Sequence, residues 1–167
     1  MIIISNFTLL YKPEDELYHL EIHEEIICSI CGSADLAPKG KPKRKIIMLD
    51  GKARCLKLKR LRCRNCTKFH RVLPDIIIPY KHHCAETYSD VINNGAVNAI
   101  YCEAYTIQRI KAWWAAMQLY IESILLAIRE KQGVDLTTEK KLGKIVRAIA
   151  NAHLWPGTRS ALTPEQT

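Results

Sequence analysis

The spacing of apolar residues changes its period near residue 80, and this divides the chain into two halves. Before that point apolar and polar residues tend to alternate with a period of two, which is typical of β-strands. Residues 1–27 predict one or two short strands, and residues 45–49 and 52–62 predict two more. Asp50-Gly51 lies between the last two strands and predicts a two-residue hairpin turn. The first half of the chain is therefore expected to be rich in β-structure.

After Pro79 the apolar positions follow the helical period of three to four residues. Helices are predicted over residues 85–93, around residues 96–100, over residues 103–132 and over residues 138–152. Asn93-Asn94-Gly95 is a stop signal for the first of these helices, and Gly133 closes the third. The residues after Trp155-Pro156-Gly157 are polar and are expected to form a loose tail.

The longest predicted helix carries an apolar stripe in which intervals of three and four residues alternate, as in a heptad repeat. The stripe consists of Ile107, Ile110, Trp114, Met117, Ile121, Ile124 and Ile128. Such a stripe packs either against the last helix of the same chain or against a second copy in a homodimer. The sequence leaves both arrangements open.

Positive charge is concentrated in one segment of the 167-residue chain. Between Lys39 and Arg71 there are 14 Lys and Arg residues and a single acid, Asp50, so this segment carries +13. Because the whole chain carries +8, the remaining residues carry −5. Such a segment favours nucleic acid or an anionic surface as partner. No run of about 18 apolar residues occurs, so we expect a cytoplasmic protein, associated with the nucleoid if it binds DNA.

Four of the seven cysteines form two C-x2-C pairs: Cys28 and Cys31, then Cys63 and Cys66. Two such pairs brought together by a hairpin predict a tetrahedral thiolate site of the zinc-ribbon type. Zinc is the favoured metal, and iron in a rubredoxin-like cage is the alternative. Four thiolates leave no open coordination position, so one structural Zn²⁺ is expected. The other three cysteines lack this spacing and are expected to pack as small apolar side chains: Cys55, Cys84 and Cys102.

The segment from Glu103 to Trp114 looks like the recognition helix of a helix-turn-helix, because a polar start is followed by a Thr-Ile step, an arginine and an aromatic pair. In such a helix Tyr105, Gln108 and Arg109 reach base edges, whereas Thr106 and Lys111 meet phosphates. An amphipathic core helix with a polar outer face is the alternative. In the β-rich half, the predicted DNA contacts are Lys43, Arg44, Lys45, Lys57, Lys59 and Arg60.

These features together predict an α+β protein. Residues 1–80 are expected to form a β-rich zinc-ribbon domain that holds its metal with four cysteines. Residues 81–155 are expected to form an all-α, helix-turn-helix-like domain with a long amphipathic helix, and residues 156–167 a polar tail.

Several short motifs between residues 24 and 160 also carry a resemblance to a known family. They are Cys28-x2-Cys31-Gly32, Arg60-Leu61-Arg62-Cys63-x2-Cys66, His70-x2-Leu73-Pro74-Asp75, Pro79-Tyr80-Lys81, Ala85-Glu86-Thr87, Thr106-Ile107 and Trp155-Pro156-x-Thr158-Arg159. With these motifs the chain resembles a bacterial family of transposase-related proteins that is catalogued as a domain of unknown function. The resemblance implies a zinc ribbon followed by a helix-turn-helix, as in the DNA-end-binding part of some insertion-sequence transposases, and it implies no activity.

Catalysis is not expected from this sequence. A transposase core holds two metal ions with three carboxylates on a mixed sheet, whereas nearly all carboxylates after residue 80 fall on predicted helices. The leading hypothesis is a zinc-containing protein that binds double-stranded DNA, as a regulator or remnant of a mobile element. Whether the chain is complete or part of a larger transposase stays open.

Three other functions remain as alternatives: an RNA-binding zinc-ribbon module, an adaptor whose heptad stripe binds a partner helix, and a rubredoxin-like electron carrier that holds iron in place of zinc. Proteins that read single strands usually interleave aromatic rings with basic residues. Apart from His70, the one aromatic ring between Lys39 and Arg71 is Phe69. This scarcity favours the duplex over the single strand.

Overall fold

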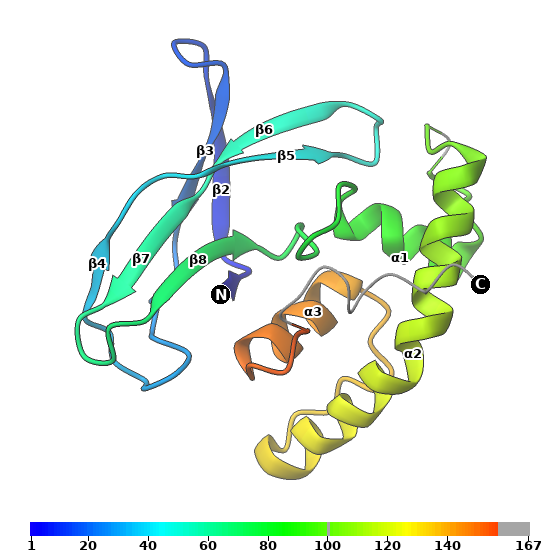
Figure 1. Ribbon diagram of the computed structural model, residues 1–167. Helices are drawn as coiled ribbons and strands as arrows, with labels where there is room; N and C mark the ends of the chain where they lie inside the picture. Colours follow the sequence, from blue (N-terminus) through cyan, green and yellow to red (C-terminus); the bar gives the residue numbers. More distant parts are fainter. Residues whose placement is uncertain (100, 157–167) are drawn as a thin grey trace.

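A computed structural model describes residues 1–99 and 101–156 of the chain (Figure 1). The strands in these residues are β1 (Ile2–Ile4), β2 (Phe7–Lys12), β3 (Leu17–Ile22), β4 (Leu36–Pro38), β5 (Lys43–Ile47), β6 (Ala53–Lys57), β7 (Lys59–Cys63) and β8 (Phe69–Pro74). The helices are α1 (Ala85–Asn94), α2 (Ala104–Gln132) and α3 (Leu142–Asn151). The strands form two mixed sheets with the orders β1-β8-β7-β4 and β2-β3-β6-β5. None of the helices in this described part combines the length and the apolar character that crossing a membrane requires.

The first sheet joins segments that are far apart in the sequence. β7 and β8 form an antiparallel hairpin, β4 adds antiparallel to β7, and β1 runs parallel to β8 at the opposite edge. All three residues of β1 are buried isoleucines, so the apolar start of the chain becomes part of the core. The first sheet therefore combines a ribbon of β4, β7 and β8 with the strand at the N-terminus.

The return strand predicted over residues 52–62 is two strands in different sheets. β6 pairs with β5 and β3 in the second sheet, whereas β7 belongs to the first. Leu58 lies between β6 and β7. Its side chain is buried, and its backbone N–H donates to the Pro42 carbonyl at 2.9 Å. The predicted hairpin of β5 and β6 is confirmed, but its turn is longer than two residues, since the Gly51 N–H donates to the Met48 carbonyl.

The predicted helix ends are mostly confirmed. α1 and α2 stop where glycines adopt left-handed backbone angles, with φ of 67° at Gly95 and 69° at Gly133. The last helix begins at Leu142, later than predicted. The short helix expected around residues 96–100 is absent from residues 96–99, and residue 100 lies outside the described part of the chain. The Asp90 carboxylate holds this segment as a loop, because it accepts backbone hydrogen bonds from residues 98 and 99 at 2.8 Å each.

The prediction of an all-α, helix-turn-helix-like domain is wrong. A helix-turn-helix joins its two helices by a tight turn of three to four residues, whereas residues 95–103 separate α1 from α2. Buried residues from both sheets and all three helices also form one hydrophobic cluster. The helices therefore form a layer on a mixed β-structure. The domain limits 1–80, 81–155 and 156–167 stay a prediction, and the tail from residue 157 lies outside the described residues.

The heptad stripe of α2 faces the interior of its own chain. Ile110, Met117, Ile121, Ile124 and Ile128 are buried, and the other two stripe residues are half-buried against the same cluster. Packing within the chain thus accounts for the stripe, and a homodimer through residues 107–128 stays a prediction.

α3 lies between α2 and the first sheet and bonds directly to the free edge of β1 (Figure 1). The Asn151 side chain accepts a hydrogen bond from the Ile3 N–H at 2.8 Å and donates one to the Ile3 carbonyl at 2.9 Å. Gly143 lies so close to the segment after β8 that a Cβ atom there would meet the Asp75 carbonyl oxygen at 2.5 Å. These contacts join the helical layer to the sheet that carries the cysteines.

Candidate metal centre and nucleic-acid interface

The two C-x2-C segments have the same backbone geometry. We call residues 28–32, before β4, the first knuckle and residues 63–67, between β7 and β8, the second knuckle. In each, the N–H of the first cysteine donates to the carbonyl oxygen five residues later, at 2.8 Å for Cys28 and 2.9 Å for Cys63. The last residue of each knuckle is left-handed, with φ of 70° at Gly32 and 62° at Thr67. This shared turn directs both cysteines of each knuckle to one side.

The four sulfur atoms of the knuckles come together as the sequence predicts. Cys28 Sγ lies 3.5 Å from Cys66 Sγ, and Cys31 Sγ lies 3.6 Å from Cys63 Sγ. All four sulfurs lie within 4.8 Å of one another, and the described residues hold no second such group. A tetrahedral site with Zn–S bonds of about 2.3 Å requires sulfurs about 3.8 Å apart. The cluster therefore fits one metal ion of this kind.

Backbone amides favour thiolates in this cluster. The Ser33 amide bonds to the Cys31 sulfur and lowers the pKa of that thiol to about 6. The Lys68 amide lowers the pKa of Cys66 too, but desolvation and the neighbouring sulfurs outweigh it and raise that pKa to about 12. The pKa values of these two thiols are thus shifted in opposite directions. A divalent cation offsets the repulsion between neighbouring thiolates and allows all four cysteines to ionise.

His70 closes the buried side of the cluster. Its side chain is 1% exposed, and its Nε2 lies 3.2 Å from Cys28 Sγ. Burial lowers the pKa of His70, which favours the neutral imidazole. With its hydrogen on Nε2, this ring donates to the Cys28 sulfur, as outer groups commonly do around metal ligands. His70 is thus a positioning residue for the candidate metal centre.

The outer face of the same sheet is basic. The register of β7 and β8 sets Arg60 opposite Arg71 and Arg62 opposite Phe69. Because side chains alternate along a strand, all four point away from the buried side. Lys39 follows β4, and its backbone N–H donates to the Arg60 carbonyl at 2.7 Å, so it extends the same surface. We call the cations Lys39, Arg60, Arg62 and Arg71 the basic face.

Acidic groups do not balance the charge of the basic face in the part of the chain that the structure describes. Within the described residues, no carboxylate lies within 4.0 Å of any of its four cations. Two of their guanidinium groups lie against an aromatic ring instead, with the Cζ of Arg60 4.6 Å and that of Arg62 5.7 Å from the Phe69 centroid. The face therefore presents uncompensated positive charge and one aromatic ring to solvent.

The six strand residues predicted as DNA contacts do not form one surface. Lys57 donates to the Asp15 carboxylate at 2.8 Å, and Arg44 donates to the Lys81 carbonyl at 2.6 Å, so contacts within the chain engage both. The others are exposed or half-buried on β5 and β7: Lys43, Lys45, Lys59 and Arg60. Arg60 alone of the six belongs to the basic face as defined here.

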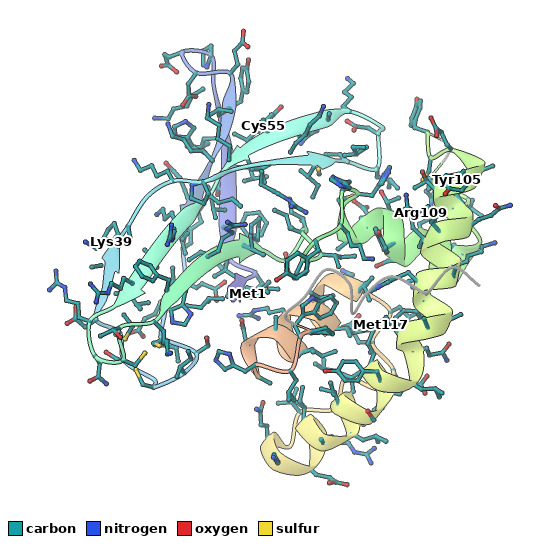
Figure 2. All side chains as sticks on the ribbon, in the orientation of Figure 1. Met1, Lys39, Cys55, Tyr105, Arg109 and Met117 are labelled. Atoms are coloured by element: carbon teal, nitrogen blue, oxygen red, sulfur yellow. The ribbon has the colours of Figure 1, made fainter. Side chains whose placement is uncertain are left out.

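The five helix residues predicted as DNA contacts lie on the first turns of α2. Thr106 is half-buried and the rest are exposed: Tyr105, Gln108, Arg109 and Lys111. Figure 2 shows Lys39 near β4 and Tyr105 and Arg109 on α2, on opposite sides of the molecule. The basic face and the start of α2 are thus two separate surfaces. Because the fold is not a helix-turn-helix, α2 is not the recognition helix of one, and contact of these five residues with DNA stays a prediction.

Sequence reasoning missed most of the basic face. Arg62, Phe69 and Arg71 were not among the predicted contacts, and neither was Lys39. A signal was present, since Arg60 and Arg62 precede the second knuckle at alternate positions and Phe69 and Arg71 follow it in the same way. In a hairpin whose tip is the knuckle, these positions share one face.

Comparison with known proteins adds one finding. Residues 28–110 match the model of a family described as Domain of unknown function (DUF6431). The matched segment includes both knuckles, the basic face and the start of α2. No curated protein and no solved structure matches the chain. The family description is silent on transposition and source, so the transposase relation stays a prediction.

Proposed function

We propose that this protein binds nucleic acid through the basic face of a zinc ribbon. The observation that carries the proposal is a set of four exposed cations without carboxylate partners in the described residues. Three lie on β7 and β8 of one sheet, and Lys39 directly follows β4 of the same sheet. Cations whose charge no carboxylate neutralises are available to phosphate oxygens, and each phosphate they neutralise releases bound counterions. A polyanion with regularly spaced phosphates therefore fits this surface.

Zinc has a structural role in this proposal. Four thiolates complete a tetrahedral shell, so no position remains open for a substrate. The metal would link the segment before β4 to the hairpin of β7 and β8, which are the strands of the basic face. Binding of metal would thereby preorganise the cations. The proposal includes no chemical step.

Elemental analysis tests the metal. We expect one zinc per chain and a colourless protein. A red protein that contains iron would instead indicate a rubredoxin-like site. Replacement of Cys31 by Ser should abolish stoichiometric zinc, and retention of one zinc per chain by this variant would contradict the assignment of ligands.

Nucleic-acid binding is tested with the zinc-loaded full chain. Fluorescence anisotropy would measure the Kd for a labelled random duplex DNA and for a labelled single strand at about 50 and 200 mM salt. Four phosphate contacts predict that affinity falls about 50- to 150-fold between these concentrations. Double-stranded DNA is the partner that the sequence favours, and both forms offer phosphates. If the protein binds neither the duplex nor the single strand at low salt, the proposed function is refuted.

A further inference from the structure

Phe69 is an apolar ring that the fold leaves in solvent. It is 52% exposed at the start of β8, on the face opposite the buried His70 and Val72. Most of the large apolar residues of β7 and β8 are buried, so the position of Phe69 does not serve the core. Its immediate neighbours on this face are cations, since Arg62 is its register partner and Arg60 lies across from the next outward position. An exposed ring surrounded by guanidinium groups is a known type of stacking surface for bases.

The two arginines contribute flat surfaces of their own. Their Cζ atoms lie 4.6 and 5.7 Å from the ring centroid, within the usual range for cation–π contact. Guanidinium planes stack on bases as aromatic rings do. A nucleotide whose base lies on this surface would place its phosphate beside the remaining cations, Lys39 and Arg71.

Phenylalanine has no hydrogen-bonding group, so it cannot read base edges in a groove. Its ring can instead cover the face of a base, and in a duplex the base faces are already stacked on one another. We propose that the Phe69 ring stacks on an unpaired base, so that the basic face binds single-stranded nucleic acid with little sequence preference. This inference rests on the proposed function and names the form of nucleic acid that this surface selects.

The test compares the zinc-loaded wild type with Phe69→Leu, which keeps an apolar side chain but removes the aromatic face. Tyr11→Leu is the matched control, because Tyr11 is similarly exposed at 53% but lies on β2 of the second sheet. Anisotropy would be measured with a labelled 12-nucleotide thymidine strand and with a 12-base-pair duplex. Loss of one stacking contact predicts about 5- to 100-fold weaker binding of the single strand by Phe69→Leu. Duplex binding by this variant and both affinities of the control should change less than about twofold.

A second measurement changes the oligonucleotide. An oligonucleotide of the same length made of abasic sites keeps the phosphates and lacks the bases. Wild-type protein should bind it more weakly than the thymidine strand by about the same 5- to 100-fold factor. Phe69→Leu should bind the abasic strand as well as wild type does, because no base remains to be stacked. Equal affinity of wild type for the abasic and thymidine strands would overturn the inference.

The outcomes separate this inference from the proposed function. If wild type binds neither nucleic acid, both fail. If wild type binds and Phe69→Leu binds the single strand equally well, base stacking fails while phosphate binding stands. An equal loss on duplex and single strand would also overturn stacking, because the ring would then act by orienting the arginines. Competition by a polyglutamate peptide as effective as the oligonucleotide would replace nucleic acid with an acidic protein as the partner, and both proposals would fall.

Discussion

The salt dependence of binding is the sharpest test of the basic face. Replacement of Arg60 and Arg71 by alanine removes two of its four cations, which face each other across β7 and β8. Both side chains are exposed and neither has an acidic partner in the described part of the chain. The double variant should therefore fold and bind zinc as wild type does. What should change is the number of phosphates that are neutralised on binding.

The magnitude follows from counting contacts. Each phosphate neutralised on a single strand contributes about 0.7 to the slope of log affinity against log salt. Four cations predict a slope of about −2.8, and two predict about −1.4. Between about 50 and 200 mM salt, wild-type affinity should fall about 50-fold, whereas the affinity of the double variant should fall about 7-fold. The comparison of slopes is insensitive to a uniform loss of affinity.

The assay is an anisotropy titration of a labelled single strand at five salt concentrations in this range. The control is Lys131→Ala with Lys140→Ala, which removes the same charge from two exposed positions that belong to neither sheet. The control should keep the wild-type slope. An unchanged slope for Arg60→Ala with Arg71→Ala, or an equal reduction in the control, would refute the assignment of phosphate contacts to the basic face.

Three further substitutions test the metal centre and the packing of the helical layer. His70→Phe should weaken zinc affinity about 10-fold in competition with a chromophoric chelator, because it removes the N–H donor to the Cys28 sulfur. Asn151→Ala should lower the free energy of unfolding in urea by about 2–4 kcal/mol, since it leaves the backbone N–H of Ile3, and partly its carbonyl, without partners. Gly143→Ala should lower the same free energy by about 1–3 kcal/mol, because the new Cβ would meet a backbone oxygen at 2.5 Å.

Each of these expectations has an opposite outcome. Unchanged zinc affinity in His70→Phe would show that the ring only fills space beside the cluster. Asn93→Ala is the control for Asn151→Ala, because the Asn93 amide makes one exposed hydrogen bond, to the Lys140 carbonyl. An equal loss of unfolding free energy in the two variants would contradict the role given to Asn151 at the edge of β1. Alanine is the better helix former by about 1 kcal/mol, so a net stabilisation in Gly143→Ala would show that α3 can move away from the sheet.

The features that local chemistry sets could be predicted from the amino-acid sequence. A C-x2-C segment places two sulfurs on one side of a tight turn whatever surrounds it, so two such segments sufficed to predict the cluster. Helix ends at Gly95 and Gly133 were equally local, because a left-handed residue after the last turn terminates a helix in most contexts. The alternating pattern in residues 1–27 predicted one or two short strands, and this segment contains three, of which Ile2–Ile4 is the first.

The pairing of the strands could not be predicted in this way, because it depends on contacts between segments that are distant in the sequence. The residues around Leu58 contain no sequence signal that the chain passes there from one sheet to the other. The residues around Ile3 likewise do not predict its parallel pairing with β8 or its hydrogen bond with Asn151. The prediction of a recognition helix was wrong because an amphipathic core helix can have the same local sequence pattern. The connection before the helix distinguishes the two kinds of helix. The basic face arises likewise from register, which brings Arg60, Arg62, Phe69 and Arg71 onto one surface beside the second knuckle.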